Sequence, residues 1–227
     1  MSKEIDFSSV LAAAVHDMKN SLNLLIQTLE SLDDTIPKEN KESREYLSQV
    51  HYESARLNTG LVQMLSLYRA EINGLPLNID EHVVEDLIIE LVGANQTYSQ
   101  QRKIEITTEY DESLTWFFDK DLVFLLLNDV LINAMRYGNK HIHLSANVVD
   151  NKLIVTIEDD GPGYPENMLE QSLSELAKVS VSQGRTGLGI FFARMIAHAH
   201  QNQEHRGEIQ LSNGGRFGGS VFQVKLP

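Results

Sequence analysis

In the first third of the chain, apolar residues recur every three or four positions, which is the spacing of one face of an α-helix. Residues 6–33 carry this pattern without a Gly or Pro to interrupt it. The apolar positions are Leu11, Val15, Met18, Leu22, Leu25, Leu29 and Leu32. Residues 33–37 then predict a short turn, because they combine two aspartates with a proline. A second helical pattern follows from Tyr46 to Tyr68 and stops near Gly74.

Two long helices joined by a tight turn predict an antiparallel helical hairpin. A single hairpin has too little interior to bury both apolar stripes, whereas two hairpins together form a four-helix bundle. We therefore expect residues 1–74 to form a homodimer whose subunits are related by a two-fold axis.

From residue 75 onward the pattern changes to shorter helices and alternating strands. Helices are expected around residues 83–91, 122–137 and 188–200, with Asp119 as the N-cap of the second. Strands are expected at residues 104–108, 114–118, 142–148, 153–157, 208–211 and 221–226, and Asp150-Asn151 predicts a hairpin turn. This mixture predicts an α+β domain over residues 75–227, an α/β sandwich with helices on one face of a mixed, largely antiparallel sheet.

Composition narrows the possible functions. With 19 Lys and Arg against 32 Asp and Glu, the 227-residue chain has a formal net charge of -13. That charge argues against non-specific binding of nucleic acid, which requires positive charge to neutralise phosphates. Because there is no cysteine, disulfides and cysteine-ligated zinc are excluded. No apolar run approaches the roughly 20 residues needed to cross a bilayer, so we expect a cytoplasmic protein with no membrane span.

The first candidate for chemistry is His16, in the run His16-Asp17-Met18-Lys19-Asn20. At about 100° per residue, His16 lies roughly 140° from Leu11 and so falls on the polar face of its helix. Alone, it is most simply an incidental histidine on a solvated face. With Asp17 beside it, the imidazole could be held in one tautomer or give up its proton as it attacks an electrophile. Asn20 lies one turn along, within reach of the same ligand.

The second candidate is the run Asn133-Ala134-Met135-Arg136-Tyr137-Gly138, which ends the predicted helix over residues 122–137. Asp129 and Asn133 are four residues apart and share a helix face. Two oxygen ligands one turn apart suit Mg²⁺, and Arg136 could bind phosphate. A helix end that contains a buried Asn network explains the same residues equally well.

The remaining candidates are rich in glycine. Asp159-Asp160-Gly161-Pro162-Gly163 follows a strand directly and could be simply a tight turn. Gly187 and Gly189 open the helix near residue 190, where glycines allow an anion to approach free backbone amides. The chain contains neither a G-x-x-x-x-G-K-[ST] phosphate loop nor a dinucleotide-binding fingerprint.

In this order and spacing, the four elements together resemble a two-component sensor histidine kinase. The resemblance covers residues 6–227 and implies a dimerisation and histidine-phosphotransfer hairpin followed by a Bergerat-type ATP-binding domain. It implies that His16 is the phosphorylated residue, that Asp17 accepts the imidazole proton, and that Asn20 helps to position water when phosphate is removed from the partner. That partner would be the receiver domain of a separate response regulator.

The same resemblance implies roles in binding ATP and Mg²⁺. Asn133 matches the asparagine that holds Mg²⁺ against the phosphates, and Arg136 and Tyr137 match residues that line the nucleotide pocket. Asp159 matches the carboxylate that binds the adenine amino group, where Gly161 and Gly163 let the backbone approach. Gly187 and Gly189 match the glycines at the phosphate end, and residues 164–186 match a mobile lid. The glycine-rich turn at 214–219 is expected to be structural.

Three residues depart from the family pattern. Ser21 replaces the usual proline after Asn20, so we expect altered coupling between helix bending and phosphotransfer. Asp129 replaces the usual asparagine, and we hypothesise that its carboxylate contributes to Mg²⁺ binding or to polarisation of ATP. Arg185 replaces a glycine and could reach the γ-phosphate or restrict the lid.

Two alternatives remain open from the sequence. One is a histidine phosphotransferase that has lost ATP binding and only relays phosphate, although the retained residues around Asn133 and Asp159 argue against it. The other is a non-catalytic dimeric scaffold whose hairpin binds a partner helix. Because the sequence has no room for a sensor domain before residue 6, we expect the input to come from a separate sensor protein or from a domain outside this sequence.

Overall fold

The computed structural model describes residues 7–33, 35–37, 40, 75, 77–173, 188–203 and 205–227, together with part of the stretch 42–61. The chain divides into two compact units, Met1–Leu75 and Pro76–Pro227. Among the described helices, none combines the length and the apolar character that crossing a bilayer requires.

The N-terminal unit begins with a single long helix, α1 (Phe7–Asp33), which continues unbroken through Ser21. The Ser21 hydroxyl donates to the carbonyl oxygen of Asp17, one turn earlier, at 3.0 Å. Serine at this position is therefore compatible with a regular helix. The described residues between Glu42 and Leu61 are also helical, and Asn40 Oδ1 accepts from the backbone N–H of Ser43 at 3.2 Å.

The apolar stripe of α1 is only partly covered within one chain. Leu29 is 8% exposed, whereas four other large apolar side chains of the helix are 43% exposed or more: Met18, Leu24, Leu25 and Leu32. The dimeric four-helix bundle therefore stays a prediction, and these side chains are the surface that a second copy would cover.

The C-terminal unit contains a five-stranded sheet in the order β2-β4-β5-β9-β8. The strands are β2 (Glu105–Glu109), β4 (His141–Val149), β5 (Lys152–Asp159), β8 (Glu208–Asn213) and β9 (Ser220–Leu226). The pair β2–β4 is parallel and the other neighbouring pairs are antiparallel. This confirms the predicted mixed, largely antiparallel sheet.

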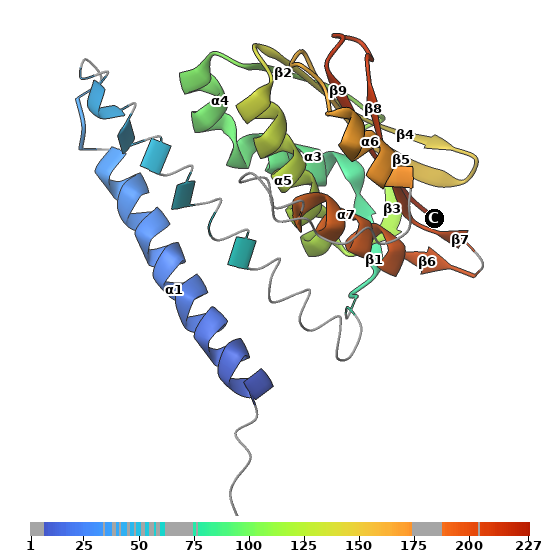
Figure 1. Cartoon of the computed structure of the whole chain (residues 1–227), viewed down its shortest axis with the longest axis horizontal. Helices are drawn as coiled ribbons and strands as arrows, with labels where there is room; N and C mark the ends of the chain where they lie inside the picture. The colour runs from blue at the N-terminus through green and yellow to red at the C-terminus, as the bar shows by residue number, and fades with distance from the viewer. Residues whose placement is uncertain are drawn as a thin grey trace, which may run out of the picture. The chain divides into compact units, whose positions relative to one another are not determined.

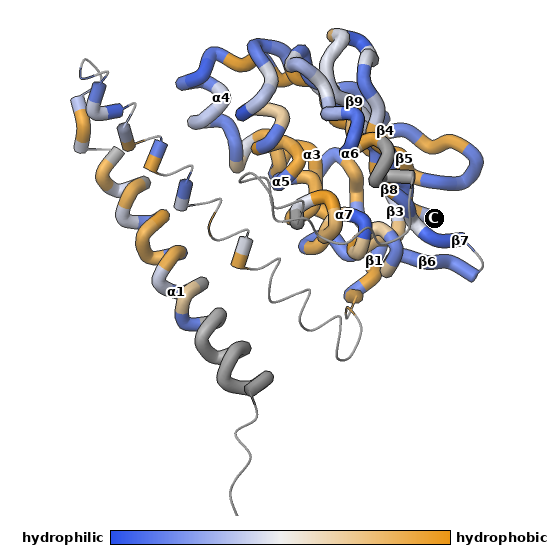
Figure 2. The backbone as a smooth tube through the Cα atoms, in the orientation of Figure 1, coloured by the Kyte–Doolittle hydropathy of each residue, from blue (hydrophilic) through white to orange (hydrophobic). Residues whose placement is uncertain are grey.

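Helices cover one face of this sheet (Figure 1), which confirms the predicted α+β class. They are α3 (Val84–Ala94), α5 (Lys120–Tyr137) and α7 (Leu188–Ala199). The core between the helices and the sheet consists of apolar side chains that are fully buried, including Leu87, Leu127, Leu131, Leu144, Phe192 and Phe222. Alternate residues of each strand point to this core, because the side-chain period of a strand is two. Figure 2 shows the helices over the sheet largely in hydrophobic colours.

Local sequence signals explain two of the boundaries. Asp119 caps α5 by accepting from the backbone N–H of Leu122 at 3.0 Å, as predicted. Asp150 and Asn151 both have positive φ, 51° and 58°, which is the conformation of a two-residue type I′ turn and confirms the predicted hairpin.

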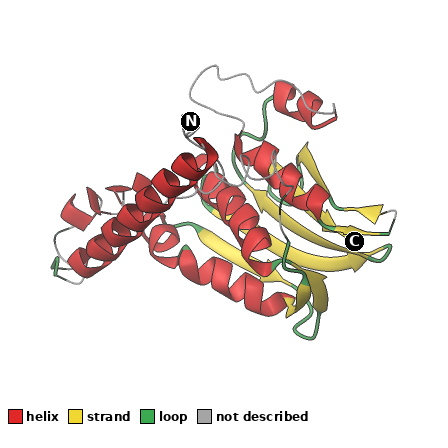
Figure 3. Ribbon diagram, turned by 90° about the horizontal axis from the view of Figure 1, so that it is seen from below, coloured by secondary structure: helices red, strands yellow, loops and turns green. Residues whose placement is uncertain are grey.

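Several short elements differ from the sequence expectations. The predicted strand at 114–118 is present as β3 (Thr115–Phe118), but it pairs with β1 (Asp80–Val83) in a separate two-stranded sheet. The pattern also did not predict β1 itself, nor α4 (Gln96–Arg102), α6 (Glu166–Leu173), β6 (Gln201–Asn202) or β7 (His205–Arg206). These elements are short and mostly polar, so their apolar residues follow no clear period. Figure 3 shows the layered arrangement of helices (red) and sheet strands (yellow).

Candidate functional site

The candidate site is built along one helix, α5, which supplies Asp129, Asn133, Arg136 and Tyr137. The Nδ2 group of Asn133 lies 3.5 Å from Oδ2 of Asp129, so the two side chains one turn apart do share a face. The neighbouring Asn128 points elsewhere and accepts from Nδ2 of Asn95 at 2.7 Å. Toward the end of the helix, the Arg136 guanidinium lies over the Tyr137 ring, 5.3 Å from its centre.

Gly189, at the start of α7, lies directly against Asp129. A Cβ atom added at Gly189 would overlap the Asp129 carboxylate, so any larger residue there would push that carboxylate aside. A helix N-terminus carries free N–H groups and partial positive charge, which favour an anion there. Asp129, Asn133 and Gly189 therefore form one polar cluster, which we call the α7 end of the site.

The other end of the site is centred on Asp159, the last residue of β5. This side chain is only 4% exposed, and its Oδ1 accepts from the backbone N–H groups of Gly161 at 2.8 Å and Ser220 at 3.2 Å. The Ser220 hydroxyl donates to Oδ2. The buried carboxylate is thus fixed in one orientation by donors from two separate loops.

Close backbone packing surrounds Asp159. A Cβ atom at Gly161 would lie 2.6 Å from the carbonyl oxygen of Tyr137, and one at Gly219 would overlap Asp159 itself. Gly163 has a φ of 80° and packs against Asn213. These glycines bring the end of α5, the loop after β5 and the turn before β9 together around one carboxylate.

Two further residues lie at this end: Ser220, which no sequence motif indicated, and Tyr164, which the family resemblance places only in the lid. Burial raises the pKa of the Tyr164 phenol most strongly, the Asp159 charge raises it further, and a hydrogen bond with Ser220 opposes both. Tyr164 therefore remains protonated beside Asp159. Asp159 and Ser220 are 61 residues apart, so no local motif links them. The one sequence feature that marks Ser220 is its position directly after Gly218-Gly219.

Asp160 has a different role from its neighbour. Its Oδ1 accepts from the backbone N–H groups of Asn139 at 2.7 Å and Lys140 at 3.0 Å. Burial alone would raise the pKa of Asp160, but these backbone donors outweigh it and hold the pKa below its usual value. Asp160 therefore fixes the connection between α5 and β4, whereas Asp159 joins the loop after β5 to the start of β9.

The two ends are separated along α5. From Asp129 to Gly138, the rise of 1.5 Å per residue gives roughly 13 Å, which suits a small molecule with a recognised group at each end. A separate cavity of about 140 Å³ is lined by Ile79, Phe117, His200, Gln201, Asn202 and Pro227. It includes none of the predicted site residues.

Some predicted residues are not placed by the structure. Arg185 and Gly187 lie outside the described residues. The backbone of His16 belongs to α1, but its side chain is outside the described part, whereas Asp17 and Asn20 are exposed on the same helix. Among the described residues, no group of three or more His, Cys, Asp or Glu side chains could hold a metal, so a metal here would need amide, phosphate or water oxygens as well.

Both units match known protein families. Residues 8–72 match the His Kinase A (phospho-acceptor) domain. Residues 118–227 match the family described as histidine kinase-, DNA gyrase B-, and HSP90-like ATPase.

Among curated proteins, the chain is similar to Sensor protein SrrB of Staphylococcus aureus (strain N315), with 28% identity over 224 residues. The match covers 96% of this chain and 37% of that protein, so the chain spans little more than a third of the relative's length.

Solved histidine kinases share the fold. Acinetobacter baumannii AdeS is 21% identical with a TM-score of 0.59, and the match covers 93% of this chain and 96% of that one. Full-length ShkA in complex with AMPPNP is 18% identical with a TM-score of 0.64, covering 96% of this chain and 45% of that one. The nucleotide-free catalytic domain of ThkA is 24% identical with a TM-score of 0.56, covering 66% of this chain and 97% of that one.

Proposed function

The chain belongs to the sensor histidine kinases of two-component systems, and from this we propose a specific reaction for it. The protein uses ATP to phosphorylate His16 and passes the phosphoryl group to an aspartate of a separate response regulator. We assign phosphotransfer and dimerisation to residues 1–74 and ATP binding to residues 75–227.

The proposal rests mainly on one observation. The polar cluster at the α7 end and the buried Asp159 carboxylate lie near different parts of the same helix, α5. The ATPase family match implies that ATP binds in this unit. We assign the adenine amino group to Asp159, whose buried carboxylate is held by Gly161 and Ser220. We assign the phosphates to the α7 end, where Asn133, Asp129 and Gly189 meet.

The donor set at the α7 end fits Mg²⁺. The amide oxygen of Asn133 and the carboxylate of Asp129 are hard oxygen donors one turn apart, and Mg²⁺ completes its shell with phosphate and water. When bound, Mg²⁺ would offset the negative charge of the phosphates. We assign Arg136 and Tyr137 to nucleotide binding between the two ends. From the family resemblance we assign Arg185 and Gly187, which lie outside the described residues, to the phosphates.

In the first reaction, a ring nitrogen of His16 attacks the γ-phosphorus of ATP. The bond from that phosphorus to the bridging oxygen breaks, ADP leaves, and the imidazole proton passes to Asp17. Most of the catalysis comes from positioning and electrostatics, as is general for phosphoryl transfer. The phosphoryl group then moves to the regulator's aspartate, and Asn20 positions water when the same surface hydrolyses the phosphorylated regulator.

We further propose that the active form is a homodimer. The exposed apolar side chains of α1, such as Met18 and Leu25, would be covered when two hairpins pair into a four-helix bundle. The signal would reach this dimer from a sensor in another protein or in a further part of the same one.

A labelling experiment tests the proposal against its alternatives. The protein is incubated with γ-labelled ATP and Mg²⁺, and wild type is compared with His16→Ala and with His205→Ala, which removes an exposed histidine from the other unit. We expect acid-labile label in wild type and His205→Ala and none in His16→Ala. Nucleotide binding without label contradicts kinase activity, and no nucleotide binding favours a phosphate relay or a scaffold.

A further inference from the structure

The turn between β8 and β9 is held from both faces of β5. Glu158 and Asp159 are consecutive, so their side chains point to opposite faces of the sheet. On the helix side, Asp159 accepts from Ser220. On the outer side, Glu158 Oε1 accepts from the backbone N–H of Arg216 at 3.0 Å. The turn closes on itself through Gly214 N–H and the carbonyl oxygen of Gly219, at 2.8 Å.

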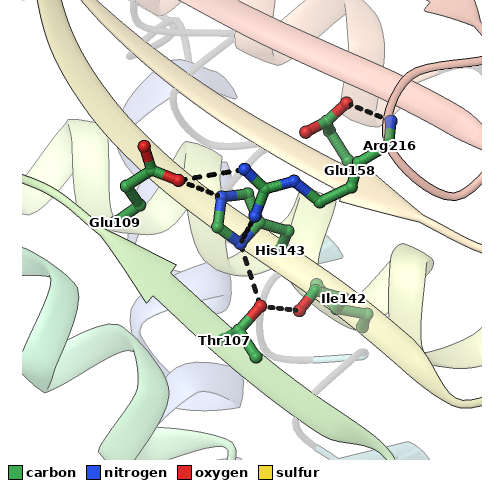
Figure 4. Close-up of polar contacts among 6 residues, drawn as sticks. All are labelled: Thr107, Glu109, Ile142, His143, Glu158 and Arg216. Carbon is green, nitrogen blue, oxygen red and sulfur yellow. Dashed lines mark hydrogen bonds and ion pairs between the residues drawn. The ribbon is translucent and has the colours of Figure 1, made fainter.

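The Arg216 side chain extends this attachment across the outer face of the sheet (Figure 4). Its Nη2 donates to Glu109 Oε2 on β2 at 3.0 Å, and its Nη1 lies 3.3 Å from His143 Nδ1 on β4. The hydrogen bond and the charge of Arg216 hold the pKa of Glu109 below its usual value. One arginine thus connects the turn to two neighbouring strands.

His143 gives this contact a defined geometry. The side chain is 3% exposed, and its Nδ1 also lies 2.9 Å from the Thr107 hydroxyl. Its Nε2 lies 3.4 Å from Glu109 Oε2. The buried ring therefore contacts side chains of Arg216, Thr107 and Glu109 at once, which fixes where the guanidinium lies on the sheet.

We propose that Arg216 is a positioning residue for the nucleotide site. By fixing the turn to the outer face of the sheet, it holds Gly219 and Ser220 against Asp159, the carboxylate assigned to adenine. This inference rests on the proposed ATP site. It extends that site to a cluster on the opposite face of the sheet, made of Arg216, Glu109, His143 and Glu158.

The expected effect of losing Arg216 falls on binding rather than on folding. The side chains of Arg216 and Glu109 are 50% and 68% exposed, and exposed ion pairs contribute little to stability. The turn they fix, however, supplies two of the three hydrogen bonds to Asp159. A small displacement of the turn therefore changes the site while the buried core stays intact.

The test measures binding of AMPPNP with Mg²⁺ by calorimetry, together with thermal unfolding, for wild type, Arg216→Ala and Arg216→Lys. The control is Lys225→Ala, which breaks the ion pair with Glu208 on the same strands, away from the turn. We expect Arg216→Ala to weaken binding roughly fivefold to tenfold, with Lys partly restoring it and the control unchanged. Unfolding temperatures should stay within about 2 °C of wild type.

A double-mutant cycle with Ser220→Ala shows whether Arg216 acts through that residue. If it does, the loss in Arg216→Ala/Ser220→Ala is smaller than the sum of the two single losses. Equal binding by Arg216→Ala and Lys225→Ala overturns the inference, as do additive losses or a fall in binding that only follows a fall in unfolding temperature. Failure of the wild type to bind the analogue instead contradicts the proposed function itself.

Discussion

At the scale of single residues, Asp129 gives the site its most unusual chemistry. It places a carboxylate next to Asn133 and against the first turn of α7, where the resemblance to other histidine kinases leads one to expect an amide. A negative charge beside a helix N-terminus is favourable. The Asp129 carboxylate would also compete with a phosphate group for the backbone N–H groups at the start of α7, unless a cation lies between the two negative groups.

We predict that Asp129→Asn lowers the affinity for Mg²⁺-ATP by about tenfold, because the variant keeps the shape of the side chain but loses its charge toward the metal. Titration at several Mg²⁺ concentrations measures this effect. Asp121→Asn, an exposed acid in the first turn of the same helix, is the matched control. Unchanged Mg²⁺-ATP affinity and autophosphorylation in Asp129→Asn would refute the role of this carboxylate.

The site residues that the sequence predicted are those that stand in short motifs. Asn133, Asp159 and Gly189 each lie within a run of neighbours whose spacing carries information. Ser220, and the position of Tyr164 beside Asp159, were not predicted because they depend on how β9 pairs with β5 and on the loop after Asp159. Such contacts join residues far apart in the sequence, and no local pattern encodes them.

At the scale of elements, Gly189 at the start of α7 leaves room for the Asp129 carboxylate of α5. An added methyl group there would displace the Asp129 carboxylate. The neighbouring core side chains, such as Phe192 and Leu127, are fully buried and hold the two helices in place. The strain would therefore fall on the short polar side chain rather than on the helix packing.

We predict that Gly189→Ala weakens Mg²⁺-ATP binding by about the same factor as Asp129→Ala, roughly tenfold. Because both changes remove the same carboxylate from its position, the double variant should bind no more weakly than either single one. Calorimetric titration of the three variants measures this. Losses that add in the double variant would show that Gly189 acts independently of Asp129.

The elements that the sequence predicted are those with a clear period. The alternation in β4 and β5 and the stripe of α5 each follow from burial on one face. The pairing of β3 with β1 was not predictable in this way, because β1 has only four residues and its first two are exposed. The seven-residue helix α4, with the sequence QTYSQQR, offers a single buried residue, Ser99.

At the scale of the whole C-terminal unit, His200 joins distant parts of the chain. Its Nδ1 donates to the carbonyl oxygen of Ile196 at 2.8 Å, and its Nε2 accepts from the backbone N–H of Asp119 at 3.0 Å. The Asp119 carboxylate in turn accepts from Asn78 N–H at 2.7 Å. The end of α7, the start of α5 and the segment before β1 thus meet at one neutral imidazole.

This arrangement makes the stability of the unit dependent on pH. Burial lowers the pKa of His200 below its ordinary value of 6.5. Below pH 6.5, the imidazole of His200 therefore binds a proton more readily in the unfolded chain than in the folded one. Stability therefore falls as pH decreases below about 6.5, by at most about 1.4 kcal/mol per pH unit for this group.

Urea unfolding at pH 7 and pH 5 checks this prediction. We expect a smaller loss of stability between the two pH values in His200→Gln than in wild type, because the variant has no group to protonate there. His205→Gln, an exposed histidine in the adjacent hairpin, should behave as wild type. The same acid loss in His200→Gln as in wild type would assign the effect to other groups.

The proposed function requires that ATP bound in the C-terminal unit supplies the phosphoryl group to His16. The most direct test locates the phosphate by tandem mass spectrometry at neutral pH, after incubation with ATP and Mg²⁺, in wild type and in Asn133→Ala. Asn133 is exposed, so its replacement leaves the core intact. We expect phosphate on His16 in wild type and none in Asn133→Ala or without Mg²⁺. Phosphate on another residue, or on His16 to the same extent in Asn133→Ala, would contradict it.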